Sequence, residues 1–451
     1  MRIRDHAPKY ASSGTHREVA AEETASRIWP YLRHIGVTRV ANITWLDSIG
    51  IPVYNAISPR SRDLISVYNG KGLRPVDAKV SAVMEAVERF AAWLPRTPTA
   101  IASYNELARG ATAVLDPADC NTRLHARYHD DLPVSWLTGY DLVRREPVLV
   151  SMHGTIYSDQ YHESPVYHIA STNGLASGNT LEEAVTHALC ELIERDSMTL
   201  AELVTTYLEG VLRTGTSVPR QPEAVTAAMR SRHPHFDMDR LPPAVAEVVG
   251  LFRAADVEVR MVDITSELGV PSVWCATVET FGPTLDSQGH GGFGTHPDVE
   301  VAMIRALTEC AQSRAVDIQA MREDISTPDE EVPKHLQHVH RAKTINKSGW
   351  WWEPTDVLTT AADVPSHPSG DVATDLRLLL DRLVACGLDR VIVVDLSPPT
   401  VPASVARVVV PGLESWSVDH SRLGARAARL WNETVTGLAR PAEAAAAGRG
   451  V

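Results

Sequence analysis

Apolar residues recur at every third or fourth position in three long segments of the chain, and this period predicts α-helices. The three segments span about residues 75–93, 181–207 and 297–322. Weaker patterns of the same kind predict helices at residues 17–36, 376–386 and 423–447. The last segment is rich in Ala and Arg, so we expect a surface helix with a frayed end.

Segments rich in β-branched and apolar residues predict strands between these helices. They cover residues 38–59, 134–170, 257–265, 273–280, 390–396 and 406–410. Residues 95–133 and 209–245 hold few apolar periods, so we expect irregular structure there. Because strands and helices are interleaved without a strict βαβ rhythm, the pattern favours one large α+β (mixed α/β) domain with helices packed on β-sheet.

The same pattern predicts where the chain divides. We expect an N-terminal helical segment at residues 1–36, a main domain at 37–415, and a C-terminal helix and tail at 416–451. A stretch rich in His, Pro and Asp, at about 325–372, is interpreted as an insertion in the main domain. It holds His335, His338, His340 and Trp350–Trp352. These histidines are expected to be solvated rather than metal ligands, and the tryptophans to be a buried or interface anchor rather than a peptide-contacting patch.

The composition narrows the classes of function. Of 451 residues 44% are hydrophobic, enough for a sizeable core, and the formal charge of -13 argues against a nucleic-acid groove. No apolar run reaches the roughly 18 residues of a membrane span, and the first residues lack the apolar stretch of a signal peptide. Five scattered cysteines without a CxxC pair argue against a disulfide framework or a zinc site. We therefore expect a protein of the reducing cytoplasm, with Cys190 and Cys310 as small core residues.

Three predicted helices share a pattern of two oxygen-bearing side chains three residues apart. The pairs are Glu85 and Glu88 in SAVMEAVER, Glu191 and Glu194 in HALCELIER, and Glu309 and Gln312 in RALTECAQSR. This spacing places both members on one helix face, where like charges are unfavourable beside apolar residues unless a cation compensates them. Magnesium takes hard oxygen ligands from a few carboxylates together with nucleotide phosphates. The three helices could therefore converge on a magnesium–nucleotide site, although one such pair alone is most often a solvated face.

Small residues stand just before each of these helices, in NGKG (Asn69–Gly72), NGLASGN (Asn173–Asn179) and GGFG (Gly291–Gly294). We interpret these segments as loops whose main-chain amides could approach an anion at a helix N-terminus, although such loops are commonly just turns. None matches the Walker pattern or the dinucleotide fingerprint, and no GxSxG nucleophile elbow occurs. The sequence thus excludes a P-loop or Rossmann site by motif.

With these motifs the sequence resembles the YcaO family. The matching stretches lie between Thr38 and Glu414 and include TRVANITWLDSIGIPV, SVYNGKG, SAVMEAVER, NGLASGNTLEEAVTHALCELIERD, GGFGTHPDVEVAMIRALTECAQSR and VVVPGLE. The resemblance implies the YcaO fold, ATP, and more than one magnesium ion held by glutamates from three helices. It implies as metal ligands Glu85, Glu88, Glu191, Glu194 and Glu309. It implies nucleotide-side roles for Arg17, Thr24, Ser81, Asn179, Glu183, Arg195, Gln312 and Arg314.

The resemblance also implies a chemistry. A nucleophile attacks a peptide-bond carbonyl, ATP phosphorylates the resulting oxyanion, and elimination of phosphate replaces the oxygen. Phosphorylation turns a poor leaving group into a good one, and magnesium neutralises charge on the transferring group. A Cys or Ser side chain as nucleophile gives an azoline, sulfide gives a thioamide, and an amine gives an amidine.

Several stretches favour one branch of the family. The C-terminal RPAEAAAAGRGV lacks the Pro-x-Pro-x-Pro tail of many azoline-forming members, and the length implies a stand-alone member. GVTR (Gly36–Arg39) and ISVYNGKG (Ile65–Gly72) are similar to the thioamidating branch, which often acts with a TfuA partner. We therefore expect thioamide formation on a precursor peptide or protein, with homodimer assembly. Azoline or amidine formation of the bottromycin type, and a non-catalytic accessory role, are the alternatives.

Overall fold

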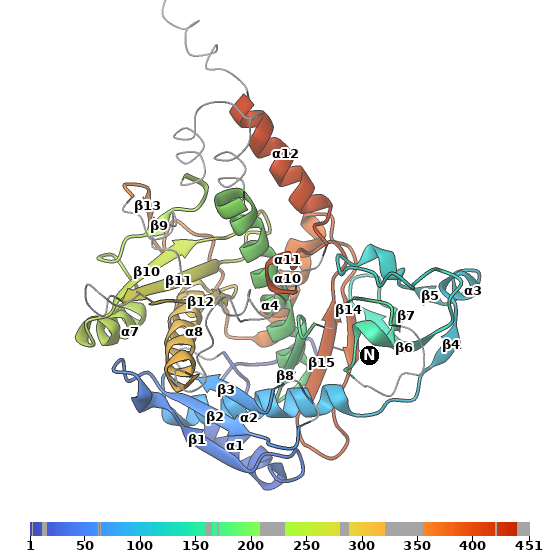
Figure 1. Cartoon of the computed structure of the whole chain (residues 1–451), viewed down its shortest axis with the longest axis horizontal. Helices are drawn as coiled ribbons and strands as arrows, with labels where there is room; N and C mark the ends of the chain where they lie inside the picture. The colour runs from blue at the N-terminus through green and yellow to red at the C-terminus, as the bar shows by residue number, and fades with distance from the viewer. Residues whose placement is uncertain are drawn as a thin grey trace, which may run out of the picture.

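The computed structural model describes residues 1, 3–10, 16–61, 63, 65–157, 165–168, 171–207, 231–279, 288–320, 355–419 and 422–439. Most of the predicted insertion, including His335, His338, His340 and Trp350–Trp352, lies outside the described residues, as does the end of the C-terminal tail. The described part is a mixture of helices and β-sheets (Figure 1). The predicted α+β class is therefore confirmed.

Three sheets carry the fold. The first is antiparallel and has the order β1 (Arg39–Asn42), β2 (Val53–Ile57), β3 (Val67–Lys71), with α1 (Ala21–Ile28) and α2 (Pro75–Trp93) beside it. The second has the order β12 (Gln288–Thr295), β11 (Ser272–Glu279), β10 (Glu258–Asp263), β9 (His235–Phe236), β13 (Leu358–Thr359). Its helices are α7 (Pro243–Ala254) and α8 (Val299–Ala320). In its β11–β12 pair, Ser272 lies opposite Thr295, and Trp274 stacks on Phe293 across the two strands.

The third sheet is the largest. Its order is β5 (Ala113–Val114), β7 (Glu146–Ser151), β6 (Val134–Asp141), β14 (Ile392–Asp395), β15 (Ser404–Val409), β8 (Leu175–Gly178), and β4 (Ala100–Ala102) pairs with β6. The helices that follow or flank it are α3 (Tyr104–Leu107), α4 (Leu181–Glu202), α10 (Val372–Ala385), α11 (Trp416–Asp419) and α12 (Ala425–Ala439). β14 and β15 come from the C-terminal quarter of the chain and lie between strands from its first half.

The helices α2, α4 and α8 each follow a strand, and the three strand–helix pairs form a ring. α2 packs on its own strand β3 and also on β8, α4 packs on β8 and β12, and α8 packs on β12 and β3. Figure 1 shows the three helices around the middle of the molecule. This arrangement turns one face of each helix toward a common centre, so the three sequence patterns that looked alike occupy equivalent places.

The small-residue segments before these helices lie mainly in the strands β3, β8 and β12, which corrects the prediction that they are loops. A Cβ added to Gly70 of β3 would lie 2.1 Å from the amide nitrogen of Ala82 in α2. A Cβ on Gly292 of β12 would lie 2.3 Å from the carbonyl oxygen of Ala306 in α8. Since real Cβ atoms do not approach so closely, these glycines let each helix pack directly against strand backbone. They serve helix–strand contact rather than an anion cradle.

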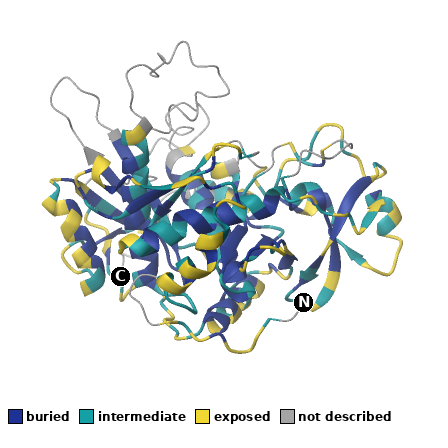
Figure 2. Cartoon of the chain, turned by 90° about the horizontal axis from the view of Figure 1, so that it is seen from below, coloured by how far each residue is buried: buried dark blue, intermediate teal, exposed yellow. Residues whose placement is uncertain are grey.

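Burial explains why α4 is the central helix. Sixteen of its 22 residues are buried, among them Ala188, Leu189 and Ile193, so it packs on almost every side. A separate apolar cluster joins α8 to the second sheet through residues such as Met261 and Leu307. Buried positions concentrate on the inner strands and helices, and exposed positions on outer helices and connections (Figure 2).

Most other element predictions are confirmed, but two more are wrong. The helix predicted over 17–36 is much shorter, because α1 ends at Ile28 and Pro30 follows within a 3-10 turn at Trp29–Tyr31. Helix α7 begins at Pro243, within the range expected to be irregular. The helical period was present, because the buried residues Val245, Val248, Val249 and Phe252 are spaced i, i+3, i+4 and i+7, but the Pro- and Arg-rich residues before it led to the expectation of irregular structure.

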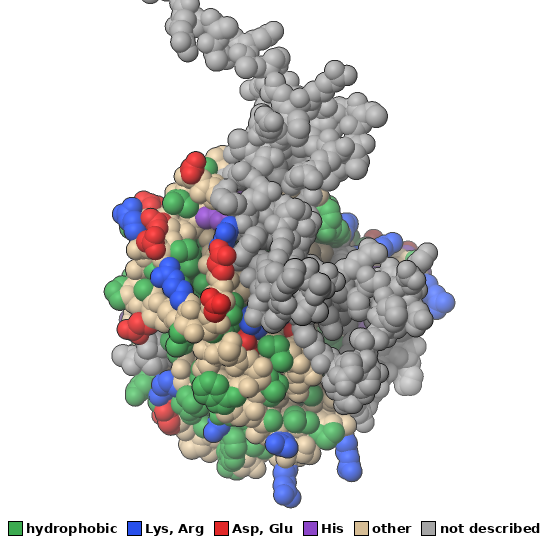
Figure 3. Space-filling view, turned by 60° about the vertical axis from the view of Figure 1, so that its left-hand side comes forward, with side chains coloured by type: hydrophobic (Ala, Val, Ile, Leu, Met, Phe, Trp, Pro, Cys, Tyr) green, Lys and Arg blue, Asp and Glu red, His purple; other side chains and the backbone are tan. Residues whose placement is uncertain are grey.

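One face of the described part carries charges of both signs, and the described helices lack membrane-spanning character. On the face shown in Figure 3, Lys and Arg side chains lie intermingled with Asp and Glu over the described part. None of the described helices has the length and apolar character that a bilayer crossing requires.

All five cysteines are unpaired thiols, and Cys190 and Cys310 are buried in helices, as predicted.

Candidate metal and nucleotide site

The inner faces of α2, α4 and α8 bring together five glutamates, here called the carboxylate cluster. Its members are Glu85, Glu88, Glu191, Glu194 and Glu309. Three of them, Glu85, Glu88 and Glu309, accept main-chain N–H groups from strands of the ring. The donors are Asn69 of β3, Ser177 of β8 and, at 3.3 Å, Phe293 of β12. The helices and the strands thus fix these carboxylates from both sides.

Burial is the main influence on the acidity of the carboxylate cluster. It raises the pKa of Glu85 and of Glu194 to about 7, against opposing attraction from nearby cations. The pKa of Glu88 is raised well above its ordinary value by burial and then by the charges of Glu191 and Glu85. The pKa of Glu191 is raised by burial as well. Such shifts show that ionising all five groups together is unfavourable in the protein alone.

Glu309 is the exception, because a lysine faces it. Burial acts to raise its pKa, but the ammonium of Lys71, which forms an ion pair with it, and the charge of Arg195 hold it below the ordinary value. The side chains of Glu309 and Lys71 are 26% and 24% exposed, so both keep contact with solvent. Glu309 is therefore ionised across the neutral range.

Lys71 was missed as a site residue although its motif, NGKG, was noted. Asn69 and Lys71 are two residues apart on β3, so their side chains share one face of the strand. An assignment of NGKG to a strand would have predicted that Lys71 points to the same centre as the glutamates of α2. Taking the glycines as a loop signal hid this relation.

The carboxylate cluster fits hard divalent cations. Lys71, Arg89, Arg195 and Arg407 lie against it, with Arg195 3.3 Å from Glu194, Arg89 3.9 Å from Glu85 and Arg407 near Glu191. Arg89 is shared with a further carboxylate, that of Asp63, at 3.6 Å. Carboxylates therefore outnumber the described cations that face them. An oxygen-only set of this kind is what magnesium takes, and a divalent ion would stabilise the ionised carboxylates that burial disfavours.

Four predicted nucleotide-side residues are brought together at the edge of the carboxylate cluster. The Thr24 hydroxyl donates to the side-chain oxygen of Asn179 at 2.9 Å, and Asn179 donates to Glu183 through its main chain at 2.8 Å and its side chain at 3.0 Å. Arg17 lies 3.9 Å from Glu183, and burial lowers its pKa. This network joins the N-terminal segment to the start of α4.

The remaining predicted residues lie in two kinds of place. Ser81 is one turn before Glu85 on α2, and Gln312 is one turn after Glu309 on α8, so both share the faces of those glutamates. Arg314 instead makes a buried double contact with Asp47, at 2.9 and 3.0 Å. This contact joins α8 to the segment between β1 and β2, and the role of Arg314 toward a nucleotide stays a prediction.

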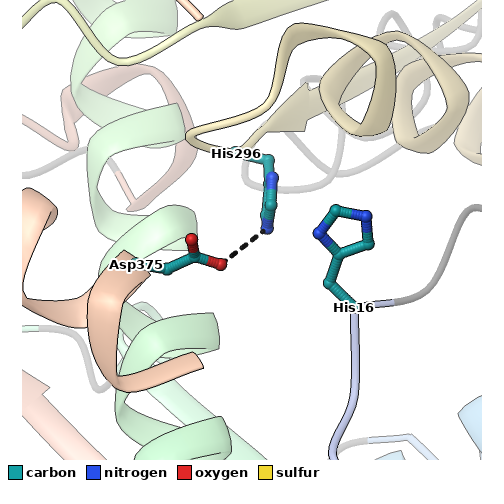
Figure 4. A group of neighbouring side chains, drawn as sticks. All are labelled: His16, His296 and Asp375. Atoms are coloured by element: carbon teal, nitrogen blue, oxygen red, sulfur yellow. Dashed lines mark ion pairs between the residues drawn. The ribbon is translucent and has the colours of Figure 1, made fainter. Parts of the chain in front are cut away.

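A second group of titratable side chains lies beside Arg17 (Figure 4). His16 of the N-terminal segment, His296 after β12 and Asp375 of α10 have their ligand-type atoms within 4.8 Å of one another. Lys9 pairs with Asp375 at 2.5 Å and donates to His16 Nδ1 at 2.9 Å. The ammonium therefore occupies the position between these acceptors that a metal ion would need.

The histidine tautomers agree with this interpretation. His296 Nδ1 accepts the main-chain N–H of Asp298 at 3.0 Å, so its proton is on Nε2, which points at Asp375 at 3.6 Å. Burial lowers the pKa of His296 well below its ordinary value and that of His16 to about 4, so both rings are neutral at neutral pH. Lys9 thus anchors the N-terminal segment next to Arg17, and the group is not arranged as a metal centre.

Comparisons with known proteins show which family the chain belongs to. The family model described as YcaO cyclodehydratase, ATP- and Mg2+-binding, matches residues 69–414. An uncharacterized protein of Methanothermobacter thermautotrophicus is 35% identical over 90% of this chain and 97% of its own. An uncharacterized protein from the tfuA 3' region of Rhizobium leguminosarum bv. trifolii is 32% identical over 91% of this chain and 92% of its own.

A solved structure shows the same fold. YcaO from Methanopyrus kandleri, bound with AMPPCP and Mg2+, superposes with a TM-score of 0.65 at 25% identity. The match covers 93% of this chain and 98% of that one. The family match, the full-length relatives and the ring of glutamate-bearing helices agree, and the chain belongs to the YcaO family.

Proposed function

We propose that this protein activates a backbone amide of a peptide or protein by ATP-dependent O-phosphorylation, and that sulfide then replaces the oxygen to give a thioamide. One observation carries the first part: five glutamates from α2, α4 and α8 face one centre with more negative charge than the described cations balance. A purely peptide-binding accessory protein would have no use for such a costly arrangement. The family's ATP- and Mg2+-binding description supports the same conclusion.

The residues of the chain divide the work. The carboxylate cluster would hold magnesium, in more than one ion because five carboxylates exceed what one octahedral ion with bound phosphates takes. Arg17, Thr24, Asn179 and Glu183 would hold the nucleotide at the edge of the cluster. Bound ATP and magnesium supply the phosphoryl group and neutralise its charge during transfer.

Charge and rigidity are the contributions of the protein itself. Lys71, paired with Glu309, and Arg195, beside Glu194, place positive charge where phosphate oxygens would lie. The strand N–H groups that donate to Glu85, Glu88 and Glu309 keep these carboxylates fixed, so little reorganisation is needed when the charge moves.

The thioamide branch has separate support. The Rhizobium relative, which covers nearly the whole chain, comes from the tfuA 3' region. We therefore propose a TfuA-type partner that supplies sulfur to this protein. Cyclodehydration to an azoline is the alternative, and the family description, which names a cyclodehydratase, favours it.

Intact-mass spectrometry tests the proposal. The precursor peptide encoded beside this gene is incubated with enzyme, ATP and magnesium, with and without sulfide. A sulfide-dependent gain of about sixteen mass units is expected, because sulfur replaces the activated oxygen. A loss of about one water without sulfide would instead establish azoline or amidine formation.

Matched variants separate chemistry from binding. Glu309→Gln is expected to abolish the mass change, whereas Glu247→Gln, an exposed position on α7, should leave it intact. Wild-type enzyme that binds the peptide but hydrolyses no ATP and changes no mass, even with the TfuA-type partner present, would contradict the proposal and favour an accessory role.

A further inference from the structure

A cavity lies next to the carboxylate cluster, between β15, α4 and the end of β7. Its walls include Val150, Asn173, Leu192, Arg407, Val409 and Leu413. It encloses about 80 Å³ of solvent-accessible space. That is room for several water molecules, or for a short piece of main chain with a small side chain.

The walls of this cavity differ in character from the carboxylate cluster. None of its described lining residues is acidic, and Val150, Leu192 and Val409 give it an apolar floor. A metal–phosphate group needs anionic ligands, so it would not be held here. A neutral ligand with a few polar atoms fits this lining better.

Two polar side chains in the wall have buried atoms without hydrogen-bond partners. Arg407 of β15 is 7% exposed, and its Nε and Nη1 have no partner among the described residues. The side-chain oxygen of Asn173 is also buried and without a partner there. Leaving such groups unpaired costs on the order of 1–3 kcal/mol each, so a ligand that pairs with them is favoured.

The unpaired atoms comprise donors on Arg407 and an acceptor on Asn173. A peptide unit offers the complement, a carbonyl oxygen that accepts and an N–H that donates. The pairing therefore matches a peptide main chain, and the apolar floor matches an adjoining side chain.

Two residues of the cavity wall connect it to the carboxylate cluster. Leu192 in its wall is the residue after Glu191 on α4. The guanidinium of Arg407 is close enough to Glu191 to oppose the rise in the pKa of that carboxyl. It also faces the hydroxyl of Tyr157. Arg407 thus lies between the cavity and the carboxylate cluster.

We propose that this cavity holds the substrate peptide at the amide to be activated, with Arg407 donating to its carbonyl oxygen and Asn173 accepting from a main-chain N–H. The assignment rests on the proposed function. As a nucleophile attacks the carbonyl carbon, the π electrons move to the oxygen, and the hydrogen bond from Arg407 strengthens with the developing charge. The oxygen then bonds to the γ-phosphorus of ATP, and ADP departs.

Kinetics of two variants test this assignment. Arg407→Lys keeps the charge but loses the planar set of donors, and Asn173→Ala removes the acceptor. For Arg407→Lys we expect kcat/KM for the precursor peptide to fall about 100-fold, the cost of losing an oxyanion donor. For Asn173→Ala we expect the KM for peptide to rise about tenfold, the cost of one neutral hydrogen bond. The affinity for a non-hydrolysable ATP analogue should be unchanged in both.

The control is Arg144→Lys, an exposed arginine between β6 and β7 that pairs with Asp389 at 3.0 Å and does not line the cavity. If wild type modifies the peptide and both variants match it, the cavity assignment is wrong while the proposed function stands. If wild type modifies nothing, the proposed function fails first. Should Arg407→Lys not fold, as judged by its melting curve, the peptide KM of Asn173→Ala decides.

Discussion

Helix α4 carries buried acids in two different settings. Near its C-terminal end, Asp196 is fully buried, pairs with Arg426 of α12 and accepts the main-chain N–H of Glu414 at 2.9 Å. Less than two turns earlier, Glu191 and Glu194 face other carboxylates from α2 and α8. Burial raises the pKa of Asp196 to about 7 too, so the pKa alone does not separate the two settings. The charges of the neighbouring groups do separate them.

The difference separates structure from function. Asp196 is matched inside the protein by a cation and a donor, so it joins the C-terminal segment to the central helix. The carboxylate cluster is left short of positive charge, which costs stability in the protein alone and is relieved only by added cations. An unbalanced buried cluster is thus a stronger indication of a ligand site than burial or acidity by itself.

The largest effect is expected from breaking the matched pair. Asp196→Ala should lower the free energy of unfolding by about 3 kcal/mol, because Arg426 loses its fully buried partner. Urea denaturation measures the change. Asp389→Ala, at an exposed ion pair with Arg144, should change stability by less than about 0.5 kcal/mol. Equal losses in the two variants would show that Asp196 is no structural anchor.

Next in size is the loss of activity from Glu191→Gln. The amide keeps the shape but removes a charge that would hold magnesium, so ATP-dependent peptide modification should fall about 100-fold or more. The melting temperature should not decrease, since burial disfavours the charged form of Glu191. Steady-state assays and thermal melts check both. Full activity in this variant would remove Glu191 from the metal site.

A smaller effect is expected on the pH dependence of metal binding. The pKa values of Glu85 and Glu194, about 7, lie above the ordinary value of 4.5, so the folded protein holds protons that the unfolded chain has lost between these limits. Their contribution to stability therefore falls as pH rises from 4.5 to about 7. Magnesium must displace these protons, so its stabilising effect should grow between about pH 6 and about pH 8.

Melting curves with and without magnesium at the two pH values measure this trend. EDTA should abolish it. In Glu85→Gln the trend should be weaker, because one of the two titrating groups is absent. A magnesium stabilisation that is constant or declines over this range would contradict the proposed protonation of the carboxylate cluster.

The smallest expected effect is on stability, and it directly tests whether the carboxylate cluster, unlike Asp196, lacks compensating charge. Glu88→Gln should stabilise the protein without ligands by about 0.5–2 kcal/mol, the range seen when a functional site is relieved of strain. Burial and two neighbouring carboxylates oppose the charge of Glu88, and a glutamine oxygen can still accept the N–H of Ser177. Denaturant unfolding is the measurement, with Glu247→Gln as control. Destabilisation would mean that the charge of Glu88 is already compensated.

The part of the site that could be predicted from the sequence was the repeated pair of oxygen-bearing side chains three residues apart. Two oxygen-bearing side chains three residues apart lie on one helix face whatever surrounds the helix, so local geometry suffices. The resemblance to the YcaO family added Arg17, Thr24, Asn179 and Glu183, and the structure brings these four together. Their proposed roles toward a nucleotide remain predictions.

The misassigned segments show where local signals fail. The glycines of Asn69–Gly72 and Gly291–Gly294 look like turns, because glycine weakens a strand in isolation. In the fold they belong to β3 and β12, where a helix lies too close for any side chain. The contact of Arg314 with Asp47 was hidden from sequence analysis for a related reason, since the two residues are far apart in the sequence. Long-range packing decides both cases.

By itself, the sequence determined the three central helices, the positions of the paired glutamates and the mixed class of the fold. These follow from periodicity and local geometry, which act over a few residues. Only the tertiary structure decided that the three strand–helix pairs close into a ring, that Lys71 faces Glu309, and that Arg407 lines a cavity beside Glu191. The reason is physical: charge imbalance and unpaired donors are properties of groups brought together from distant parts of the chain, and no local window contains them.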